Sequence, residues 1–306
     1  MNNAPTGGRL TKNERREQAR EQARLLREEA RKKEKRNRIL LQSGIVVGVL
    51  AVVAVIALVI VNSVRPAGPG PANMASDGVV IQAGGEVLRT PALEPGETPA
   101  PAPTPTGSEV IQIQVFVDYM CPFCGQFEAT NAEYLRSLVE SGAASLEILP
   151  ISFLDRSSMG TAYSTRAMNA VGCVADQQPD SVLRFHELLF ENQPPEPSEG
   201  LTNDQLVEFA REAGAKSASV ESCIREQRFK DWTEAATDRS MGERGVGGTP
   251  TVYVNGQVYT GTVFGQQYSG SLTDQATFRQ FVNSAQGVQF LEDSAATPSP
   301  TPTATP

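Results

Sequence analysis

Two cysteines separated by two residues are the clearest chemical feature of this chain. In the stretch "DYMCPFCGQFE" they are Cys121 and Cys124, half of the four cysteines present. Thiols at this spacing can form and break a disulfide, bind zinc together with a second pair, or close a small structural loop. The choice depends on the elements that position them and on the compartment in which they lie.

The expected elements favour redox chemistry. The apolar run "VIQIQVFVDY" predicts a central strand covered on both faces, and residues 121–141 predict a helix. A strand-to-helix junction places Cys121 at the helix N-terminus, where free N–H groups and the helix dipole stabilise a thiolate. Cys124 follows one turn later on the same face. We therefore expect Cys121 to be the exposed attacking sulfur and Cys124 the buried partner that resolves a mixed disulfide.

Zinc binding and a purely structural bridge are weaker alternatives. Four-cysteine zinc sites usually combine two closely spaced pairs, whereas Cys173 and Cys223 are 50 residues apart in helical segments. The single histidine, His186, has no zinc-type spacing to a cysteine and is expected to be packed within its helix. No phosphate loop or dinucleotide fingerprint occurs in the sequence. The sequence therefore predicts no metal and no cofactor.

Charge and hydropathy divide the chain. Residues 1–40 carry 13 Lys/Arg and 6 Asp/Glu, whereas residues 41–306 carry 14 and 29, a balance that argues against nucleic acid as a partner. The 26 uncharged residues Ile39–Val64 are long enough to cross a membrane. A cleaved signal peptide usually has a shorter apolar core, so an uncleaved anchor is favoured. Because basic residues stay in the cytoplasm, the chain after Arg65 is expected outside the cell membrane, where disulfides persist.

Composition and periodicity predict five parts. They are a basic cytoplasmic helical arm at 1–38, a membrane anchor at 39–64, a Pro-rich tether with a short hairpin at 65–108, a globular domain at 109–291 with a helical insertion at about 156–242, and a disordered Pro/Thr tail at 292–306. After the insertion, "TPTVYVNGQVYTG" predicts a hairpin that turns at Asn255-Gly256. A closing helix follows, with Thr273 or Asp274 as its N-cap.

This order of elements and three motifs resemble the DsbA-like thiol-disulfide oxidoreductases, in particular the membrane-anchored type of Gram-positive bacteria. The motifs are "FVDYMCPFCGQFE", "SSMGTAYSTRAMNAVGCVA" and "GGTPTVYVNG", and the resemblance covers most of residues 109–285. It implies an α/β, thioredoxin-like fold with an inserted helical domain, here preceded by a single transmembrane helix. It also implies thiols of secreted or cell-surface proteins as substrates, and a membrane partner of the quinone-linked kind that reoxidises the enzyme.

The resemblance also assigns roles to residues outside the cysteine pair. Sequence alone predicts an ordinary trans proline at Pro250, whereas the family places a cis-proline opposite the CxxC, with the backbone of Thr249 pairing with an extended substrate. By sequence alone, Cys173 and Cys223 are two free thiols, a second redox pair or a bridge. An even pair outside the membrane is most often bridged, and related anchored proteins carry such a structural disulfide.

Two residues near the pair bear on the direction of catalysis. Asp118 is predicted either to cap the helix or to aid proton transfer to Cys124, and the cap is favoured. Well-known family members carry histidine between the cysteines, whereas Phe123 adds neither charge nor a side-chain hydrogen bond. A thiol oxidase is the leading function. A tethered reductase, for example in cytochrome maturation, and a non-enzymatic envelope binding module are the alternatives.

Overall fold

The computed structural model describes residues 12–63, 68–103 and 110–296. The chain divides into two units, one that ends at Pro66 and one that begins at Ala67. Each unit is described by itself.

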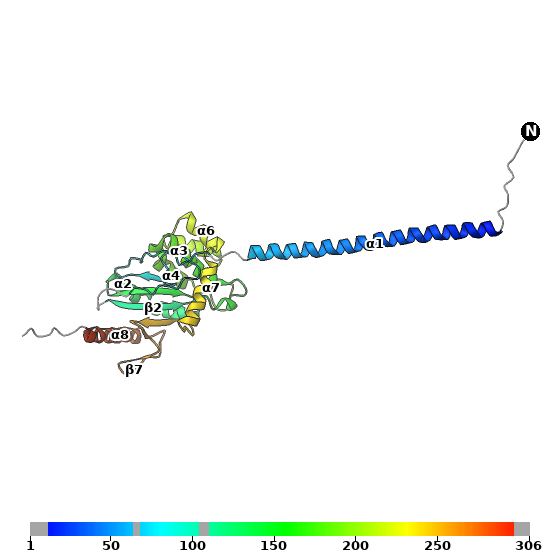
Figure 1. Cartoon of the computed structure of the whole chain (residues 1–306). Coiled ribbons are helices and arrows are strands. Elements are labelled where there is room, and N and C mark those ends of the chain that lie inside the picture. Colours follow the sequence, from blue (N-terminus) through cyan, green and yellow to red (C-terminus); the bar gives the residue numbers. More distant parts are fainter. Residues whose placement is uncertain (1–11, 64–67, 104–109, 297–306) are drawn as a thin grey trace, which may run out of the picture. The chain divides into compact units, whose positions relative to one another are not determined.

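The first unit is built on one long helix, α1 (Lys12–Ser63), drawn in blue in Figure 1. Its segment Ala23–Ile56 is long and apolar enough to cross a membrane, and none of the most apolar part is buried by other protein. Exposed apolar side chains along a helix are what a lipid environment requires. The predicted basic arm and the predicted anchor therefore continue into each other within α1, although Val64 lies outside the described residues.

A five-stranded mixed sheet forms the centre of the second unit. Its strands are β1 (Val79–Ile81), β2 (Ile111–Val117), β3 (Ala144–Pro150), β4 (Thr251–Val254) and β5 (Gln257–Val258), in the order β1-β3-β2-β4-β5. Strand β2 is parallel to β3 and antiparallel to β4. The nearly continuous apolar run before the cysteines therefore occupies the central strand, as the sequence predicts.

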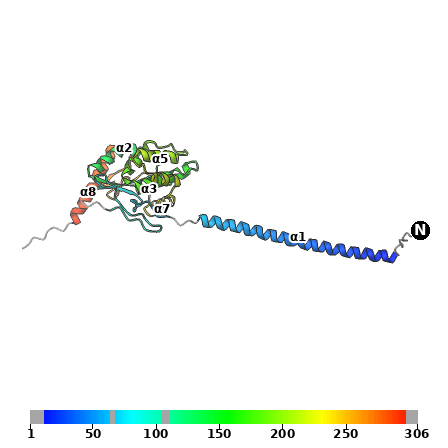
Figure 2. The ribbon, with the colours of Figure 1, turned by 90° about the horizontal axis from the view of Figure 1, so that it is seen from above.

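Helices and one small hairpin complete the second unit. The helices are α2 (Pro122–Glu140), α3 (Tyr163–Gln177), α4 (Val182–Glu191), α5 (Asn203–Glu212), α6 (Ala218–Glu226), α7 (Lys230–Asp238) and α8 (Gln275–Ala296), with short turns η1 (Asp155–Ser157) and η2 (Pro179–Ser181), a π-helical segment η3 (Arg239–Glu243) and the hairpin β6 (Thr262–Val263) and β7 (Gln266–Gln267). The insertion helices gather on one side of the unit, away from α8 (Figures 1 and 2).

The two faces of the sheet bury different side chains, because successive residues of a strand point to opposite faces. Val115 of β2 faces the larger core, where Phe127 of α2 meets Phe278 of α8 edge to face with ring centroids 5.3 Å apart. Phe116 faces the smaller core, which it shares with Val246. Helix α2 is thus fixed against the sheet, with its N-terminus at the end of β2.

Local turn chemistry follows the sequence closely at the C-terminal end. Asn255 and Gly256 have φ of 47° and 75°, so both central positions of the β4–β5 turn are left-handed, as a type I′ turn requires. Asp274 accepts hydrogen bonds from the N–H groups of Ala276 and Thr277 in the first turn of α8. The predicted hairpin turn is confirmed, and Asp274 rather than Thr273 is the cap.

The predicted borders of the globular domain are wrong at both ends. Residues 68–103 do not form a free tether: β1 pairs antiparallel with β3, so the predicted hairpin is docked on the domain, although its own pairing is a single bridge between Ile81 and Val87. The place of β1 in the central sheet depends on a distant strand, which local periodicity does not reveal. At the other end, α8 continues to Ala296, past the predicted start of the tail. The rest of the predicted tail, 297–306, lies outside the described residues.

A disulfide joins two helices of the insertion. Cys173 of α3 and Cys223 of α6 are bonded at an S–S distance of 2.05 Å, with their Cα atoms 5.8 Å apart. Both residues are fully buried. The bond fixes α3, which also packs against α4, α5 and α7, to α6.

Replacing both Cys173 and Cys223 by Ala is expected to lower the melting temperature. Opening a loop of 50 residues removes roughly 4 kcal/mol in the chain-entropy model, and alanine avoids burying two new hydroxyl groups. The rate of Cys121 alkylation at 20 °C should stay within about twofold of the wild type, because the bond joins α3 to α6 and does not involve the loop that carries Cys121. Thermal melts and alkylation kinetics check this. Lost turnover in a fully folded double variant would instead assign the pair to the redox relay.

Candidate functional site

The loop between β2 and α2 carries the cysteine pair. Strand β2 ends at Val117, and Cys121 is the N-cap residue of α2, with extended backbone angles (φ −75°, ψ 115°) and no side-chain capping bond. Pro122 occupies the first turn, where its missing N–H costs little. The sulfur of Cys121 therefore lies at the N-terminus of a 19-residue helix, where the helix dipole favours negative charge.

Both thiols are more enclosed than expected. Cys121 is only 4% exposed and Cys124 is fully buried, whereas Phe123 between them is 58% exposed. The prediction of an exposed Cys121 is therefore wrong in degree, while the greater burial of Cys124 agrees with the sequence. The enclosure comes from a second chain segment that covers the helix N-terminus.

That covering segment contains Thr249 and Pro250, which are joined by a cis peptide bond. The Cys121 Sγ–H group donates to the carbonyl oxygen of Thr249 at 3.3 Å. The hydroxyl of Thr249 is buried as well. The structure thus brings Thr249 and Pro250 to the cysteine pair across 128 residues of sequence.

The surroundings shift the two thiols in opposite directions. Hydrogen bonding from Cys124 lowers the pKa of Cys121 to about 6, with help from the Thr249 side chain and from backbone N–H groups of α2, although burial opposes the shift. Burial raises the pKa of Cys124 well above its usual range, and the nearby Cys121 raises it further. At neutral pH, Cys121 is therefore mainly thiolate while Cys124 keeps its proton, the pattern of a nucleophile and a resolving thiol.

Asp118 does not cap α2, so the favoured cap prediction is wrong. Its Oδ1 accepts from the backbone N–H of Met120 at 2.9 Å and from the Ser164 hydroxyl at 2.7 Å, and its Oδ2 accepts from the N–H of Leu154 at 3.0 Å. Two of these donors come from the segment after β3, which the local sequence around Asp118 does not reveal. The carboxyl group instead ties the active-site loop to the start of the insertion.

The same burial changes the acidity of Asp118. Its side chain is fully buried, and this burial raises its pKa from 3.8 to about 7, although the three hydrogen bonds oppose the rise. Negative charge on Cys121 raises it further. A carboxyl group beside the cysteine pair therefore changes its protonation near neutral pH, which is the property needed for proton transfer.

His186 is packed within α4 as predicted, but it also joins a buried polar chain that sequence reasoning missed. Its Nδ1 lies 2.9 Å from the Tyr119 hydroxyl, and its Nε2 lies 3.2 Å from Oε1 of Glu128. Glu128 lies in α2 and His186 lies in α4, so the local sequence around either residue does not indicate this contact.

Gln193 is a second residue without a sequence signal. It lies in the irregular segment after α4, and its side-chain amide donates to the carbonyl oxygens of Cys121 at 2.8 Å and Tyr119 at 3.2 Å. A side chain at Gly125 would collide with this amide group. The insertion therefore contacts the CxxC loop directly. In the described part of the chain, no three His, Cys, Asp or Glu side chains are grouped to hold a metal ion.

A mixed sheet that presents a CxxC at the N-terminus of a helix, opposite a cis-proline, defines a thioredoxin-like fold, here with a helical insertion. The Thioredoxin_4 family model, described as "Thioredoxin", matches residues 109–274, more than half of the chain. The chain belongs to this family and falls in its DsbA-like thiol-disulfide oxidoreductase class. The predicted fold and family are therefore confirmed.

Solved structures agree with this fold. Oxidised DsbA from Mycobacterium tuberculosis is 27% identical with a TM-score of 0.50, and the match covers 72% of this chain and 100% of that one. Oxidised BdbD from Bacillus subtilis has a TM-score of 0.51 at 19% identity, with 73% of this chain and 100% of that one covered. At that identity the second likeness speaks for the fold alone.

Curated relatives match over shorter stretches. "Disulfide bond formation protein D" of Bacillus subtilis (strain 168) is 25% identical over 150 residues, which are 48% of this chain and 64% of that protein. "Serine/threonine-protein kinase PknE" of Mycobacterium tuberculosis is 32% identical over 117 residues, 37% of this chain and 20% of the kinase. The chain thus spans only part of these relatives, and a fifth of the kinase.

The raised pKa of Asp118 predicts a specific dependence of stability on pH. The unfolded chain releases this proton near pH 4, whereas the folded protein holds it until about pH 7. Stability from this group is therefore full below pH 4 and is lost as pH rises to 7, by an amount on the order of 4 kcal/mol.

Asp118→Asn should remove this loss. We expect the difference in unfolding free energy between variant and wild type to change in favour of the variant from pH 4.5 to 7.5. Urea melts of the oxidised protein, in which Cys121 and Cys124 do not titrate, measure it. A difference that is the same at both pH values would contradict the assigned acidity.

Proposed function

We propose that this chain is a membrane-tethered, extracytoplasmic thiol oxidase that introduces disulfides into secreted or cell-surface proteins through Cys121 and Cys124. The observation that carries the proposal is the opposite acidity of the two thiols, with a Cys121 pKa of about 6 and a Cys124 pKa well above its usual range. A thiolate that the protein stabilises favours the reduced form, and this makes the disulfide form a stronger oxidant.

In the proposed reaction a substrate thiolate attacks Sγ of Cys121 in the oxidised enzyme. A mixed disulfide forms, the Cys121–Cys124 bond breaks, and Cys124 leaves and takes up a proton. A second substrate thiolate then attacks the substrate sulfur and releases Cys121 as thiolate. The substrate loses two electrons and gains a disulfide, and the enzyme keeps the two electrons as a reduced pair.

Asp118 and Thr249 assist this exchange in the proposal. Asp118 is buried beside the pair and titrates at about pH 7, so it can deliver the proton that Cys124 needs and accept it again on reoxidation. Thr249 precedes a cis-proline that has no N–H, and in the proposal the backbone of Thr249 pairs with an extended substrate segment. The Cys173–Cys223 bridge has a structural role only.

The proposed location follows from α1. Its basic first part stays in the cytoplasm, its apolar part crosses the membrane, and the domain from Ala67 onward lies outside. A reduced enzyme must pass two electrons on before it can act again. A quinone-linked membrane protein is the proposed acceptor, because the anchor holds the enzyme at the surface where such a partner resides.

A tethered reductase remains the second candidate for one reason. The Cys121 pKa of about 6 lies between the values for the nucleophilic cysteines of thioredoxin, about 7, and of a strongly oxidising DsbA, about 3.5. Reduction and oxidation use the same pair in opposite directions. The reduction potential of the pair therefore decides between them.

Trapping tests the roles of the two cysteines. In Cys124→Ser the resolving thiol is gone, so mixed disulfides between Cys121 and substrate proteins should accumulate at the outer membrane face. Cys121→Ser serves as the matched control and should trap nothing. Non-reducing gels of cells quenched with acid measure both. Trapping through Cys124 in the control, or no trapping in either variant, would contradict the assignment.

Protease protection tests the proposed orientation. Protease added to intact cells without a cell wall should remove the domain after Ala67 and leave the basic N-terminal arm intact, because the membrane shields the arm. Antibodies against the two ends read out the result, and detergent-permeabilised cells are the control in which both are cut. Cleavage of the arm with the domain spared would reverse the topology.

A further inference from the structure

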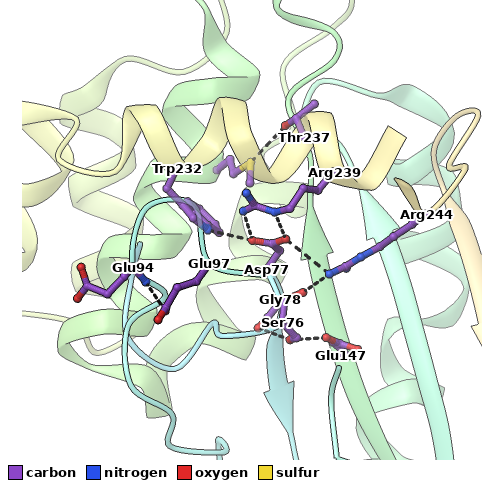
Figure 3. A network of polar contacts seen from close by, with 11 residues as sticks. Ser76, Asp77, Gly78, Glu94, Glu97, Glu147, Trp232, Thr237, Arg239 and Arg244 are labelled. Carbon is purple, nitrogen blue, oxygen red and sulfur yellow. Dashed lines mark hydrogen bonds and ion pairs between the residues drawn. The ribbon is translucent and has the colours of Figure 1, made fainter. Parts of the chain in front are cut away.

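A buried ionic cluster lies between the segment before β1 and the end of α7 (Figure 3). The carboxylate of Asp77 is 1% exposed and accepts two hydrogen bonds from Arg239, at 2.8 Å from Nε and 2.6 Å from Nη2. The indole N–H of Trp232 donates to it at 3.3 Å. Arg244 lies 3.5 Å from the same carboxylate and donates to the carbonyl oxygen of Ser76 at 2.7 Å.

The acidic side of this cluster cannot shift easily against the sheet. The Ser76 hydroxyl donates to Glu147 of β3 at 2.5 Å, and the partly visible strand β1 begins just after it in Figure 3. A side chain at Gly78 would collide with Leu149 and Glu147. Asp77 itself is left-handed, with φ of 67°. These contacts fix the carboxylate relative to β3, and through it relative to β2 and the cysteine pair.

The two arginines of the cluster lie in the chain segment that runs on to Thr249 at the cysteine pair. Arg239 begins the π-helical segment η3, which closes with a hydrogen bond from the N–H of Arg244 to the carbonyl of Arg239 at 3.1 Å. Val246 follows, packs in the smaller core and donates its N–H to Ser240 at 3.1 Å. Thr249 is three residues further on. π-Helical turns are often found at functional sites, where they aim a side chain or loop.

We propose that Asp77 is a positioning residue for the loop that carries Thr249 and Pro250, the loop proposed to bind the substrate. By holding Arg239 and Arg244 it keeps Thr249, with both its carbonyl group and its side chain, beside the sulfur of Cys121. The inference rests on the proposed roles of Cys121 and Thr249. It makes the segment before β1, which lies outside the part of the chain matched by the family model, a working part of the site.

A purely structural ion pair would behave differently from a positioning one. Breaking any buried ion pair lowers stability, because one charge is left without its partner. Only a positioning role also changes the thiol of the folded protein. If the Thr249 loop moves away, Cys121 loses the contact with the Thr249 side chain, which is one of the contacts that lower its pKa.

The test is Asp77→Asn in the full chain, in detergent and below its melting temperature. Asparagine accepts the left-handed backbone and removes the charge together with one of the two acceptor oxygens. Because the Cys121 pKa rises, alkylation by iodoacetamide at pH 6 should slow by about threefold, while the rate at pH 9, where the thiolate is complete, stays unchanged. Asp180→Asn is the matched control. It breaks the exposed ion pair between Asp180 and Arg89, which also links residues 68–103 to the insertion, and it should leave both rates unchanged.

An unchanged ratio of the rates at pH 6 and pH 9 in a less stable Asp77→Asn protein would overturn the proposal. If that variant does not fold, Arg244→Gln applies the same test, and an unchanged ratio there also overturns it. Failure of the proposed function is distinguishable, since the wild-type protein would then lack a Cys121 thiolate at pH 6 or trap no substrate.

Discussion

The contact between the sulfur of Cys121 and the carbonyl group of Thr249 is the constraint on which the rest of this structure depends. It joins the N-terminus of α2 to a loop 128 residues later. The contact needs β4 beside β2, so that the loop before β4 meets the loop after β2. The chain from Leu154 to Gly248 must therefore leave the sheet and return to it. The Asp118 hydrogen bonds and the Gln193 contacts tie this excursion down near the site, and the disulfide joins two of its helices to each other.

Burial and charge together give the site its chemistry. A buried thiolate is unfavourable unless hydrogen bonds and dipoles replace its hydration, and Cys121 has both at the start of α2. Cys124 and Asp118 lie deeper, where burial favours their neutral forms. The two thiols thus have pKa values that are moved apart, and the pKa of Asp118 is raised toward neutral pH. Such a set can divide the roles of nucleophile, resolving thiol and proton carrier among three side chains.

Sequence reasoning succeeded where the signal is local. The CxxC spacing, the apolar run of β2, the Asn255-Gly256 turn and the Asp274 cap each depend on a few adjacent residues. It failed where the partner is distant: donors to Asp118 come from a segment more than thirty residues later, and Gln193 reaches the site from an irregular segment. The sequence predicts the short hairpin that contains β1 but not the place of β1 in the central sheet, because that place depends on pairing with the distant strand β3.

The reduction potential of the Cys121–Cys124 couple tests the central claim most directly. It is measured by equilibrating the protein with glutathione buffers and quantifying the reduced fraction after alkylation. A Cys121 pKa of about 6 against a strongly raised Cys124 pKa predicts an oxidising couple, above roughly −200 mV and between thioredoxin and the strongest bacterial oxidant. A potential close to that of thioredoxin, about −270 mV, would contradict an oxidase and favour the reductase.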